Sequence, residues 1–541
     1  MSSIRAPRLG PIVGHTTFNT CRLWIKAEDS GDDGRTLTEN RRTIGVITVL
    51  KGKGKVDSKD PGRTNYFRLH REYDRTGTFN LGVDKGLNGS GKIFALAPNT
   101  SYRVRMGTLA LDDVLADDDI ISDDDIASRL PDPGVWVEEL MKLPEESSEA
   151  EFKTFGDTAA DTLSFILGSC RYPGLLWKKK KSDRIFQPIL EHMKNNPFNK
   201  DPRFMLMMGD QIYADTLHRT IPIGLADTYK EFQDRYLGAF GSKNMRKLLR
   251  SVPNYMILDD HEIEDNWQQD RINTAKKREL FHLAIGAYMS YQWSHGPQDF
   301  DGRLFYRFEC DGFPFFVLDE RTQRFKDDDE GLDDNHLLGR PSIVPDEEPT
   351  QLDHLCNWLS LQQKENNDRP KFIVSPTVFV PNPVVTTKND KQKEKSDSWS
   401  AFPETRKRLL SHIIDNKVQN VIFLSGDVHC SNVAKITFSG SEEAEKLKAY
   451  SITSSAFYWP FWFADGEPSN FVHNSKRKEQ KDTFKIDKAG KIKMDYTAWN
   501  FTQKDNFCQV DVDRTNKEVI VRSIDQHGKP IVTSTLALAE F

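Results

Sequence analysis

FMLMMGDQIY, residues 204–213, decides the fold: five apolar residues are followed at once by a glycine, an aspartate and, three positions later, a tyrosine. A short apolar run is typical of a strand buried on both faces of a sheet, and glycine allows the sharp turn that ends it. Three other apolar runs end in polar residues in the same way, at 163–167, 254–258 and 421–424. We therefore expect four buried strands, each leading into a polar loop.

Helical patterns lie between these strands, for example over 185–193 and 280–293, where apolar residues recur every three or four positions. Such helices would cover the faces of a sheet, so residues 156–541 are predicted to form an α/β catalytic domain. The first part of the chain instead alternates between apolar and polar positions, which is typical of a β-sandwich. Together with an acidic linker at 112–125, residues 1–155 are predicted to form an N-terminal β-sandwich domain.

The loops that follow the four buried strands are rich in metal-ligating residue types. In an open α/β sheet, ligands bind beyond the carboxyl ends of the strands, so these loops are expected to share one site. The four loops are GSCR at 168–171, GDQIY at 209–213, DDHEIEDN at 259–266 and GDVH at 426–429.

A site for two metal ions needs a bridging carboxylate and further oxygen and nitrogen ligands. Asp210 fits the bridging role, and Asp427 and His429 would project from one loop. A turn would bring the phenol of Tyr213 back to the metal that Asp210 contacts. A tyrosinate favours ferric iron, and a thiolate from Cys170 favours iron or zinc over magnesium. The combination predicts a metal-dependent phosphoesterase.

The order of these motifs, GSC, GDxxY, DDHE followed by xxxN, and GDxH, resembles the alkaline phosphatase D (PhoD-type) family of metallophosphoesterases. Further similarities are GPIVGH at 10–15, LDER at 318–321 and SWSAFP at 398–403. The resemblance implies a calcineurin-like sandwich of two mixed sheets flanked by helices. The stretch LAPNTSY at 96–102 resembles the tyrosine corner of fibronectin type III domains, so the N-terminal sandwich is expected to be fibronectin- or immunoglobulin-like.

The resemblance also implies a cluster of Fe³⁺ and Ca²⁺, with zinc, manganese and magnesium as open alternatives, and phosphomonoesterase or phosphodiesterase activity. Asp260 takes the position of the asparagine in the wider superfamily's G-N-H-E motif, and we predict it as a catalytic residue. Carried over by position, the metal ligands would be Cys170, Asp210, Tyr213, Asn266, Asp427 and His429.

A hydrolytic mechanism follows as a hypothesis. The metals would lower the pKa of a bound water, and the resulting hydroxide would attack phosphorus in line with the departing alcohol. His261 could protonate the leaving oxygen near neutral pH, with Glu262 or Asp259 orienting its ring.

Three further residues are candidates for catalysis. Arg171 and Arg321 could anchor phosphate, because a guanidinium group binds two phosphate oxygens at once. His295, in SHGP at 294–297, resembles the family's E-H-x-P histidine and is predicted to lie near the metals.

Composition limits the partners. The net charge is −6 with basic and acidic residues intermixed, which argues against a general nucleic-acid binder. No run approaches the roughly 18 apolar residues that a membrane span needs, and the first residues lack the layout of a secretory signal. We therefore expect an intracellular, cytoplasmic protein acting on a small phosphoester or a phospholipid head group. The alternatives are a non-catalytic, metal-bound scaffold that binds a partner protein, and, among enzymes, a phospholipase-like or nucleotide-cleaving diesterase.

Overall fold

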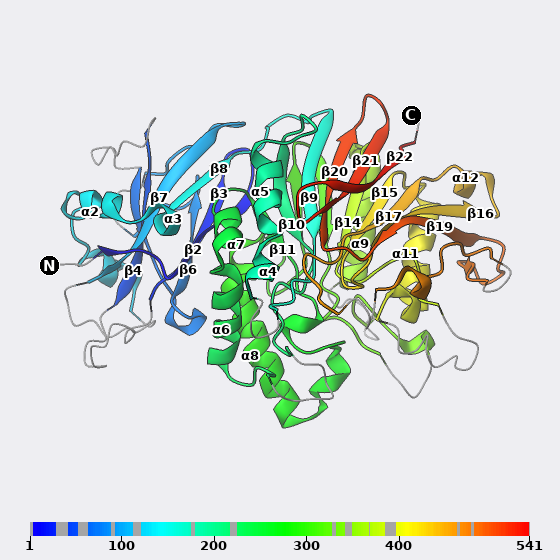
Figure 1. The fold of residues 1–541 in the computed structure, drawn as a ribbon, viewed down its shortest axis with the longest axis horizontal. Helices are drawn as coiled ribbons and strands as arrows, with labels where there is room; N and C mark the ends of the chain where they lie inside the picture. Colours follow the sequence, from blue (N-terminus) through cyan, green and yellow to red (C-terminus); the bar gives the residue numbers. More distant parts are fainter. Residues whose placement is uncertain are drawn as a thin grey trace.

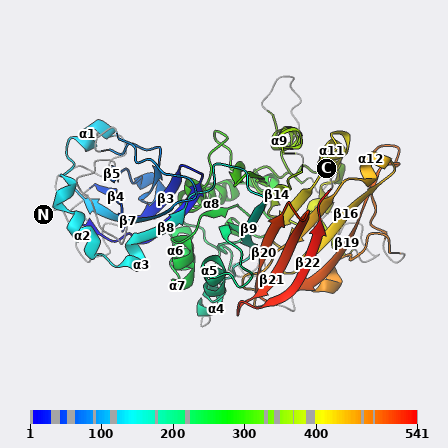
Figure 2. The same cartoon turned by 90° about the horizontal axis from the view of Figure 1, so that it is seen from above.

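The computed structural model describes residues 4–539 apart from 29–41, 52–62, 88–91, 112–120, 175–178, 217–223, 327–331, 341–348, 367, 385–396, 462–465 and 478–480. Most of the predicted acidic linker, 112–120, therefore lies outside the described residues. Figures 1 and 2 show an elongated molecule, with the N-terminal strands at one end and the two larger sheets at the other.

The N-terminal part is a sandwich of two antiparallel sheets. One sheet contains β1 (Ile4–Arg5), β7 (Ser101–Ala110), β4 (Thr43–Val49), β5 (Thr64–Phe67) and β8 (Glu149–Lys153). The other contains β2 (Leu9–Thr16), β3 (Cys21–Lys26) and β6 (Thr76–Leu81). Their inner faces form one core that includes Leu23, Ile47 and Met106. The Tyr102 hydroxyl accepts a hydrogen bond from the Ala97 amide at 2.8 Å, which is the contact of a tyrosine corner.

Short helices cover the outer side of this sandwich. They are α1 (Asp123–Ala127), α2 (Val137–Lys142) and α3 (Glu145–Ser148). Trp136 is buried between this layer and the sheet, and its indole donates to the Tyr66 hydroxyl at 2.7 Å.

The first of the two larger sheets is mixed. In spatial order it contains β11 (Asn254–Met256), β10 (Pro202–Met207), β9 (Thr162–Gly168), β20 (Asn506–Asp513), β21 (Glu518–Asp525) and β22 (Pro530–Ala537). The strands β9, β10 and β11 run parallel, and β20 adds to β9 in the antiparallel sense. Near the C-terminus, β20 and β21 form a hairpin, in which Asp513 pairs with Glu518.

The second of the larger sheets is also mixed. Its order is β12 (Tyr306–Cys310), β13 (Phe313–Val317), β14 (Lys371–Ser375), β15 (Val421–Ser425), β17 (Ala449–Thr453), β16 (Ser431–Ser439), β19 (Lys493–Thr502) and β18 (Phe484–Lys485). The strands β13, β14, β15 and β17 run parallel, and β16 is antiparallel to β17. Their near-continuous apolar character follows from burial on both faces.

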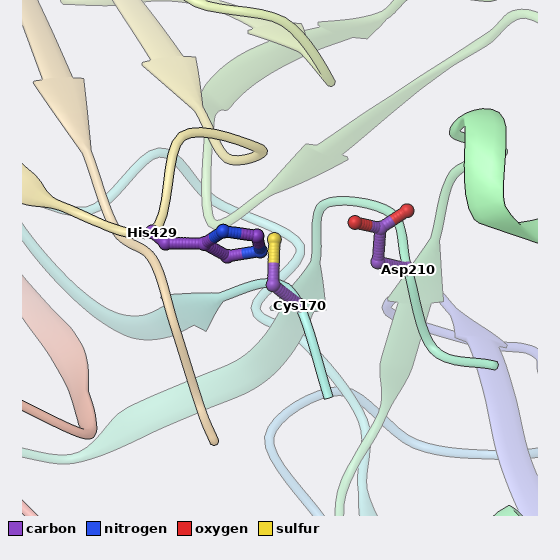
Figure 3. A group of neighbouring side chains, drawn as sticks. All are labelled: Cys170, Asp210 and His429. Carbon is purple, nitrogen blue, oxygen red and sulfur yellow. The ribbon is translucent and has the colours of Figure 1, made fainter. Parts of the chain in front are cut away.

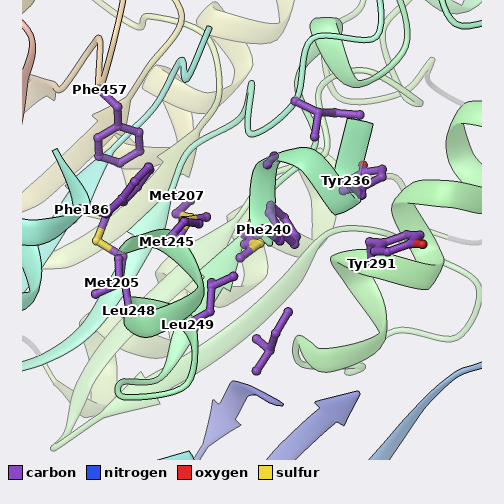
Figure 4. Close-up of a cluster of buried hydrophobic side chains, with 14 of the residues drawn as sticks. Phe186, Met205, Met207, Tyr236, Phe240, Met245, Leu248, Leu249, Tyr291 and Phe457 are labelled. Carbon is purple, nitrogen blue, oxygen red and sulfur yellow. The ribbon is translucent and has the colours of Figure 1, made fainter. Parts of the chain in front are cut away.

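The two larger sheets pack face to face around a shared core that includes Phe165, Phe315 and Leu424. The helices α4 (Lys179–Asp183), α5 (Phe186–Lys194), α6 (Tyr229–Phe240), α7 (Lys243–Leu249) and α8 (Ala275–Tyr291) lie on the side of the first sheet. Figure 4 shows part of the core beneath them, where Phe186, Met207 and Met245 lie together.

The helices α9 (Gln351–Glu365), α11 (Pro403–Asp415) and α12 (Glu442–Glu445) lie on the side of the second sheet. The order of layers is thus helix, sheet, sheet, helix. Within the described ranges, no helix combines the length and apolar character needed to cross a membrane.

Candidate metal centre

The four predicted loops converge, but their strands belong to two sheets rather than one. The strands β9, β10 and β11 lie in the first of the two larger sheets, whereas β15 lies in the second. The open-sheet reasoning was therefore wrong about the sheet, although the loops that it selected do lie together. The polar ends of the two packed sheets meet at a common edge, and this edge carries the candidate ligands.

Cys170, Asp210 and His429 form the first candidate group. They come from the loops after β9, β10 and β15, and their ligand atoms all lie within 4.8 Å of one another. Figure 3 shows the sulfur of Cys170 beside the imidazole of His429, with the carboxyl group of Asp210 across from them. A thiolate, a carboxylate and an imidazole together form a donor set suited to a transition metal.

Asp210 is common to every candidate group among the described residues. It lies in a second group with Asp260 and His261, and in a third with Asp259, Asp260 and Asp427, each within the same 4.8 Å limit. The second and third groups are rich in oxygen, which suits a harder cation. This arrangement agrees with a bridging role for Asp210.

The backbone at the candidate ligands is unusual. Five of the six predicted ligands adopt a left-handed conformation, with φ of 58° at Cys170, 57° at Asp210, 54° at Asn266, 67° at Asp427 and 52° at His429. Few residues other than glycine occupy this region, and such outliers cluster at functional sites. Consecutive strand-end turns therefore aim side chains from separate strands toward one point.

Glycine is required just before Asp210. Gly209 has a φ of 92°, and a Cβ atom there would lie 2.3 Å from the Cβ of Asp259. The loops after β10 and β11 can approach each other only because residue 209 lacks a side chain.

Tyr213 and Asn266 lie beside these groups. The Tyr213 hydroxyl donates to Oδ2 of Asp210 at 3.3 Å and lies 3.5 Å from Nε2 of His429. The backbone amide of Asn266 donates to Oδ2 of Asp260 at 2.5 Å. Tyr213 is thus at the first group, and Asn266 adjoins the oxygen-rich groups.

The electrostatics of the centre also fit bound cations. Burial, together with neighbouring carboxylates, holds the pKa values of Asp210, Asp259 and Asp427 well above the ordinary range of a carboxyl group. Burial and the charges of Asp210 and Asp427 likewise raise the pKa of the Cys170 thiol. A cation placed among these groups would offset their mutual repulsion and favour their deprotonated, ligating forms.

Two serines support Cys170. The hydroxyl of Ser455 donates to Sγ of Cys170 at 3.2 Å and accepts from the His429 amide at 3.0 Å. The Ser169 hydroxyl lies 3.1 Å from the same sulfur. Ser455 therefore links two ligands from different sheets.

Arg321 is fully buried behind the carboxylates. Its Nε donates to Oδ1 of Asp259 at 2.6 Å, and its terminal nitrogens bind the carboxylate of Asp397 at 3.1 and 2.5 Å. One terminal nitrogen lies 3.5 Å from Oδ1 of Asp260. The guanidinium therefore orients protein carboxylates, and its position does not favour the predicted role of phosphate anchor.

Arg171 points away from the metal ligands. Its guanidinium donates to the hydroxyl of Ser242 at 2.9 Å and to the Ser182 carbonyl at 3.3 Å, and it lies over the ring of Phe186. It ties the loop after β9 to the start of α7. This position does not favour the predicted phosphate-anchor role either.

His295 lies at the interface with the N-terminal sandwich. It is fully buried, its Nε2 lies 3.2 Å from the Tyr291 carbonyl, and its ring contacts that of Trp24. Burial lowers the pKa of His295 to about 3. No candidate metal group among the described residues contains it, so the prediction that His295 lies near the metals is not supported.

His261 faces the second candidate group, but its partner was not predicted. Its Nδ1 lies 2.7 Å from Oδ1 of Asp215, and its ring stacks on that of Tyr213 at 4.2 Å. Burial alone would lower the pKa of His261, but the carboxylates of Asp215, Asp260 and Asp210 hold it well above its ordinary value. The signal in the sequence was an aspartate five residues after Asp210, in GDQIYAD.

Glu262 has a different task from orienting His261. Its carboxylate accepts backbone amides from Asp210 at 3.1 Å, Gln211 at 2.7 Å and Asp259 at 3.0 Å. Burial raises the pKa of Glu262 to about 7. Glu262 therefore holds two ligand loops together. The predicted orienting role of Glu262 or Asp259 was wrong, because Asp215 makes that contact.

Three comparisons with known proteins point to one family. Alkaline phosphatase D of Bacillus subtilis (strain 168) is 23% identical over 239 residues, which cover 41% of this chain and 38% of that protein. The chain thus matches about two fifths of that relative's length. A solved structure titled "Structure of PhoD" superposes with a TM-score of 0.60 and 15% identity, covering 99% of this chain and 90% of that one, which shows a shared fold. The model of the PhoD-like phosphatase family matches residues 180–520, and the chain belongs to this family.

Proposed function

We propose that this protein is a metal-dependent hydrolase of phosphoesters, either monoesters or diesters. The observation that carries the proposal is the sharing of Asp210 among three candidate ligand groups from two sheets. A carboxylate shared in this way is what a centre with two or more ions needs to act on one phosphate group. Membership in the PhoD-like phosphatase family supports the same reaction class.

Cys170, Tyr213 and His429 would hold a transition metal together with Asp210, and we propose ferric iron there. Asp259, Asp260, Asn266 and Asp427 would hold a harder ion such as calcium. When bound, the ions would lower the pKa of a water nucleophile and neutralise charge on the phosphate. We assign the catalytic layers to the calcineurin-like arrangement and the N-terminal sandwich to the fibronectin-like class.

His261 would act as the general acid. Its Nδ1 atom is engaged by Asp215 at 2.7 Å, so Nε2 is the atom that can transfer a proton. The neighbouring carboxylates favour the protonated ring, and a protonated imidazole can donate to the oxygen of the departing alcohol. Tyr213 holds the ring plane by stacking.

The test combines turnover with metal content. Asp210→Asn keeps the size of the side chain, so we expect a folded protein that has lost bound metal and hydrolysis of both p-nitrophenyl phosphate and its bis ester. Asp234→Asn is the matched control, because Asp234 lies on α6 and its exposed carboxylate pairs only weakly with Lys230 at 3.5 Å. Full activity in Asp210→Asn would overturn the proposal.

Elemental analysis and a visible absorption spectrum of the wild-type protein identify the metals. Tyrosinate or thiolate bound to ferric iron absorbs visible light, so we expect a coloured protein. A colourless zinc protein that hydrolyses the esters would remove the iron assignment alone. Bound metal without hydrolysis of any ester would indicate the alternative, a metal-bound scaffold.

A further inference from the structure

Aromatic side chains form a cluster on one side of the candidate centre. The indole of Trp459 stacks on the imidazole of His429, with ring centroids 3.6 Å apart and planes inclined by 14°. The rings of Tyr172 and Phe461 meet the indole edge-on at 5.6 and 5.1 Å. The cluster is therefore in direct contact with a predicted metal ligand.

The members of this cluster differ in exposure. Tyr172 and Tyr213 are only 4% and 2% exposed, whereas Trp459 and Phe461 are partly exposed. The tyrosines serve as the packed base of the cluster, and the other two rings are its outer surface. This surface lies in the segment that follows β17.

The indole N–H of Trp459 has no acceptor among the described residues. The Nε1 atom is buried, and no residue in the described part of the chain accepts its hydrogen bond. The backbone amide of Trp459 donates to Asp505 at 3.2 Å, so the segment itself is held in place. A buried donor without an acceptor is costly, and it is retained where a ligand supplies the acceptor.

The cluster lies on the same side as the candidate general acid. The ring of Tyr213 stacks on His261 at 4.2 Å and lies 5.2 Å from the ring of Tyr172 and 6.3 Å from that of Trp459. A leaving group that takes a proton from His261 would therefore lie next to the aromatic surface. The carboxylates bound to Arg321 make that part of the centre unsuitable for an apolar group.

We propose that Trp459 and Phe461 bind the leaving group and give the enzyme a preference for phosphoesters of aromatic alcohols, while the Trp459 indole N–H donates to an oxygen of the bound phosphoester. This inference rests on the proposed function. Aromatic rings favour each other through edge-to-face and offset contacts beyond the burial of their area. A small alkyl leaving group gains little from such a surface.

Phenylphosphonate and methylphosphonate test the inference in the metal-loaded full chain, because neither is hydrolysed. Isothermal titration calorimetry should show that the wild type binds phenylphosphonate about tenfold more tightly than methylphosphonate. Trp459→Leu should bring the two affinities close together. Trp459→Phe keeps a ring but removes the N–H, so it should weaken both ligands to a similar extent.

Phe461→Leu and Trp499→Phe complete the design. Phe461→Leu should reduce the preference without disturbing the ring stacked on His429, so it carries the test if Trp459→Leu loses metal. Trp499→Phe is the matched control. Trp499 lies on β19, and its indole donates to Ser534 on β22 at 3.0 Å, outside the aromatic cluster. The change should alter the affinity for neither phosphonate.

The outcomes separate the two proposals. Equal affinity of the wild type for both phosphonates, or an unchanged preference in Trp459→Leu and Phe461→Leu, would overturn the inference. Unchanged binding in Trp459→Phe would remove the role of the N–H. A failure to hydrolyse phenyl phosphate and hexafluoroisopropyl phosphate, whose leaving alcohols have similar acidity, would overturn the proposed function but leave the phosphonate results valid.

Discussion

Nδ1 of His261 lies 2.7 Å from Oδ1 of Asp215, and the other oxygen of that carboxylate accepts the backbone amide of Asp265 at 2.7 Å. Asp215 is thus fixed by the main chain and in turn fixes the imidazole. Asp215→Asn retains an acceptor but removes the charge, so we expect kcat to fall by about 10- to 100-fold.

The pH profile distinguishes this role from simple loss of structure. Asp215 raises the pKa of His261, so its neutralisation should lower that pKa. His261 must be protonated to act as an acid, and activity is lost as pH rises through its pKa. The alkaline limb of kcat should therefore move to lower pH in Asp215→Asn but not in Asp234→Asn. A uniform loss at every pH would argue against the assignment.

Metal removal should destabilise the protein, and more so at higher pH. Burial raises the folded-state pKa values of Asp210, Asp259 and Asp427, so the metal-free folded state binds more protons than the unfolded chain. Stability of this state is therefore lost as pH rises. We expect a chelator to lower the melting temperature, with a larger drop at mildly alkaline than at mildly acidic pH. Identical melting curves with and without chelator would contradict a filled centre.

Arg171→Met should affect stability rather than substrate binding. The Arg171 guanidinium donates to Ser242, whose hydroxyl in turn donates to Asp183 at 2.6 Å. Loss of this buried contact should lower the free energy of unfolding by about 1–3 kcal/mol. Urea titration measures the change, and the KM for a phosphoester should stay the same. A raised KM at unchanged stability would restore the phosphate-anchor role.

Lys371 is predicted to make stability depend on pH on the alkaline side. It is fully buried at the start of β14, and burial lowers its pKa from 10.5 to about 7. Between these values the unfolded chain binds more protons, so stability rises with pH in this window. Lys371→Met removes the titration, and we expect the variant to be more stable by about 4 kcal/mol at neutral pH, because the pKa falls from 10.5 to about 7 and each pKa unit corresponds to about 1.4 kcal/mol.

The comparison is made by urea titration at several pH values. The difference between wild type and Lys371→Met should shrink as pH approaches 10.5. Lys435→Met is the control, because Lys435 is exposed on β16. Its free energy of unfolding should differ from that of the wild type by the same amount at every pH. A pH-independent difference for Lys371→Met would show that its amine stays charged in the folded protein.

Local pattern was sufficient to predict the elements that carry the ligands. The apolar runs before Cys170, Asp210 and Asp427 form the strands β9, β10 and β15, because burial on both faces requires such runs. The pattern does not reveal which strands pair. A fully buried strand has the same apolar sequence pattern in either sheet. The place of β15 in the second sheet is set by its contacts with strands distant in the sequence, which the pattern does not encode.

The direction of a side chain was harder to predict than its presence. Arg171 follows a ligand in the sequence, yet its guanidinium turns to Ser242 at the start of α7. Asp215 lies two residues beyond Tyr213, but its role depends on His261, which comes from another loop. Both outcomes follow from tertiary packing, which a motif of a few residues does not encode.

The arrangement of β9 and β20 has a consequence for how the protein is made. The strand before Cys170 is flanked by β10 on one side and by residues 506–513 on the other. During synthesis β9 therefore has one edge unpaired until residues 506–513 have been made. An exposed edge of this kind invites pairing with other chains. A chain truncated before residue 506 would leave the candidate ligand loops of the first sheet on an unfinished support.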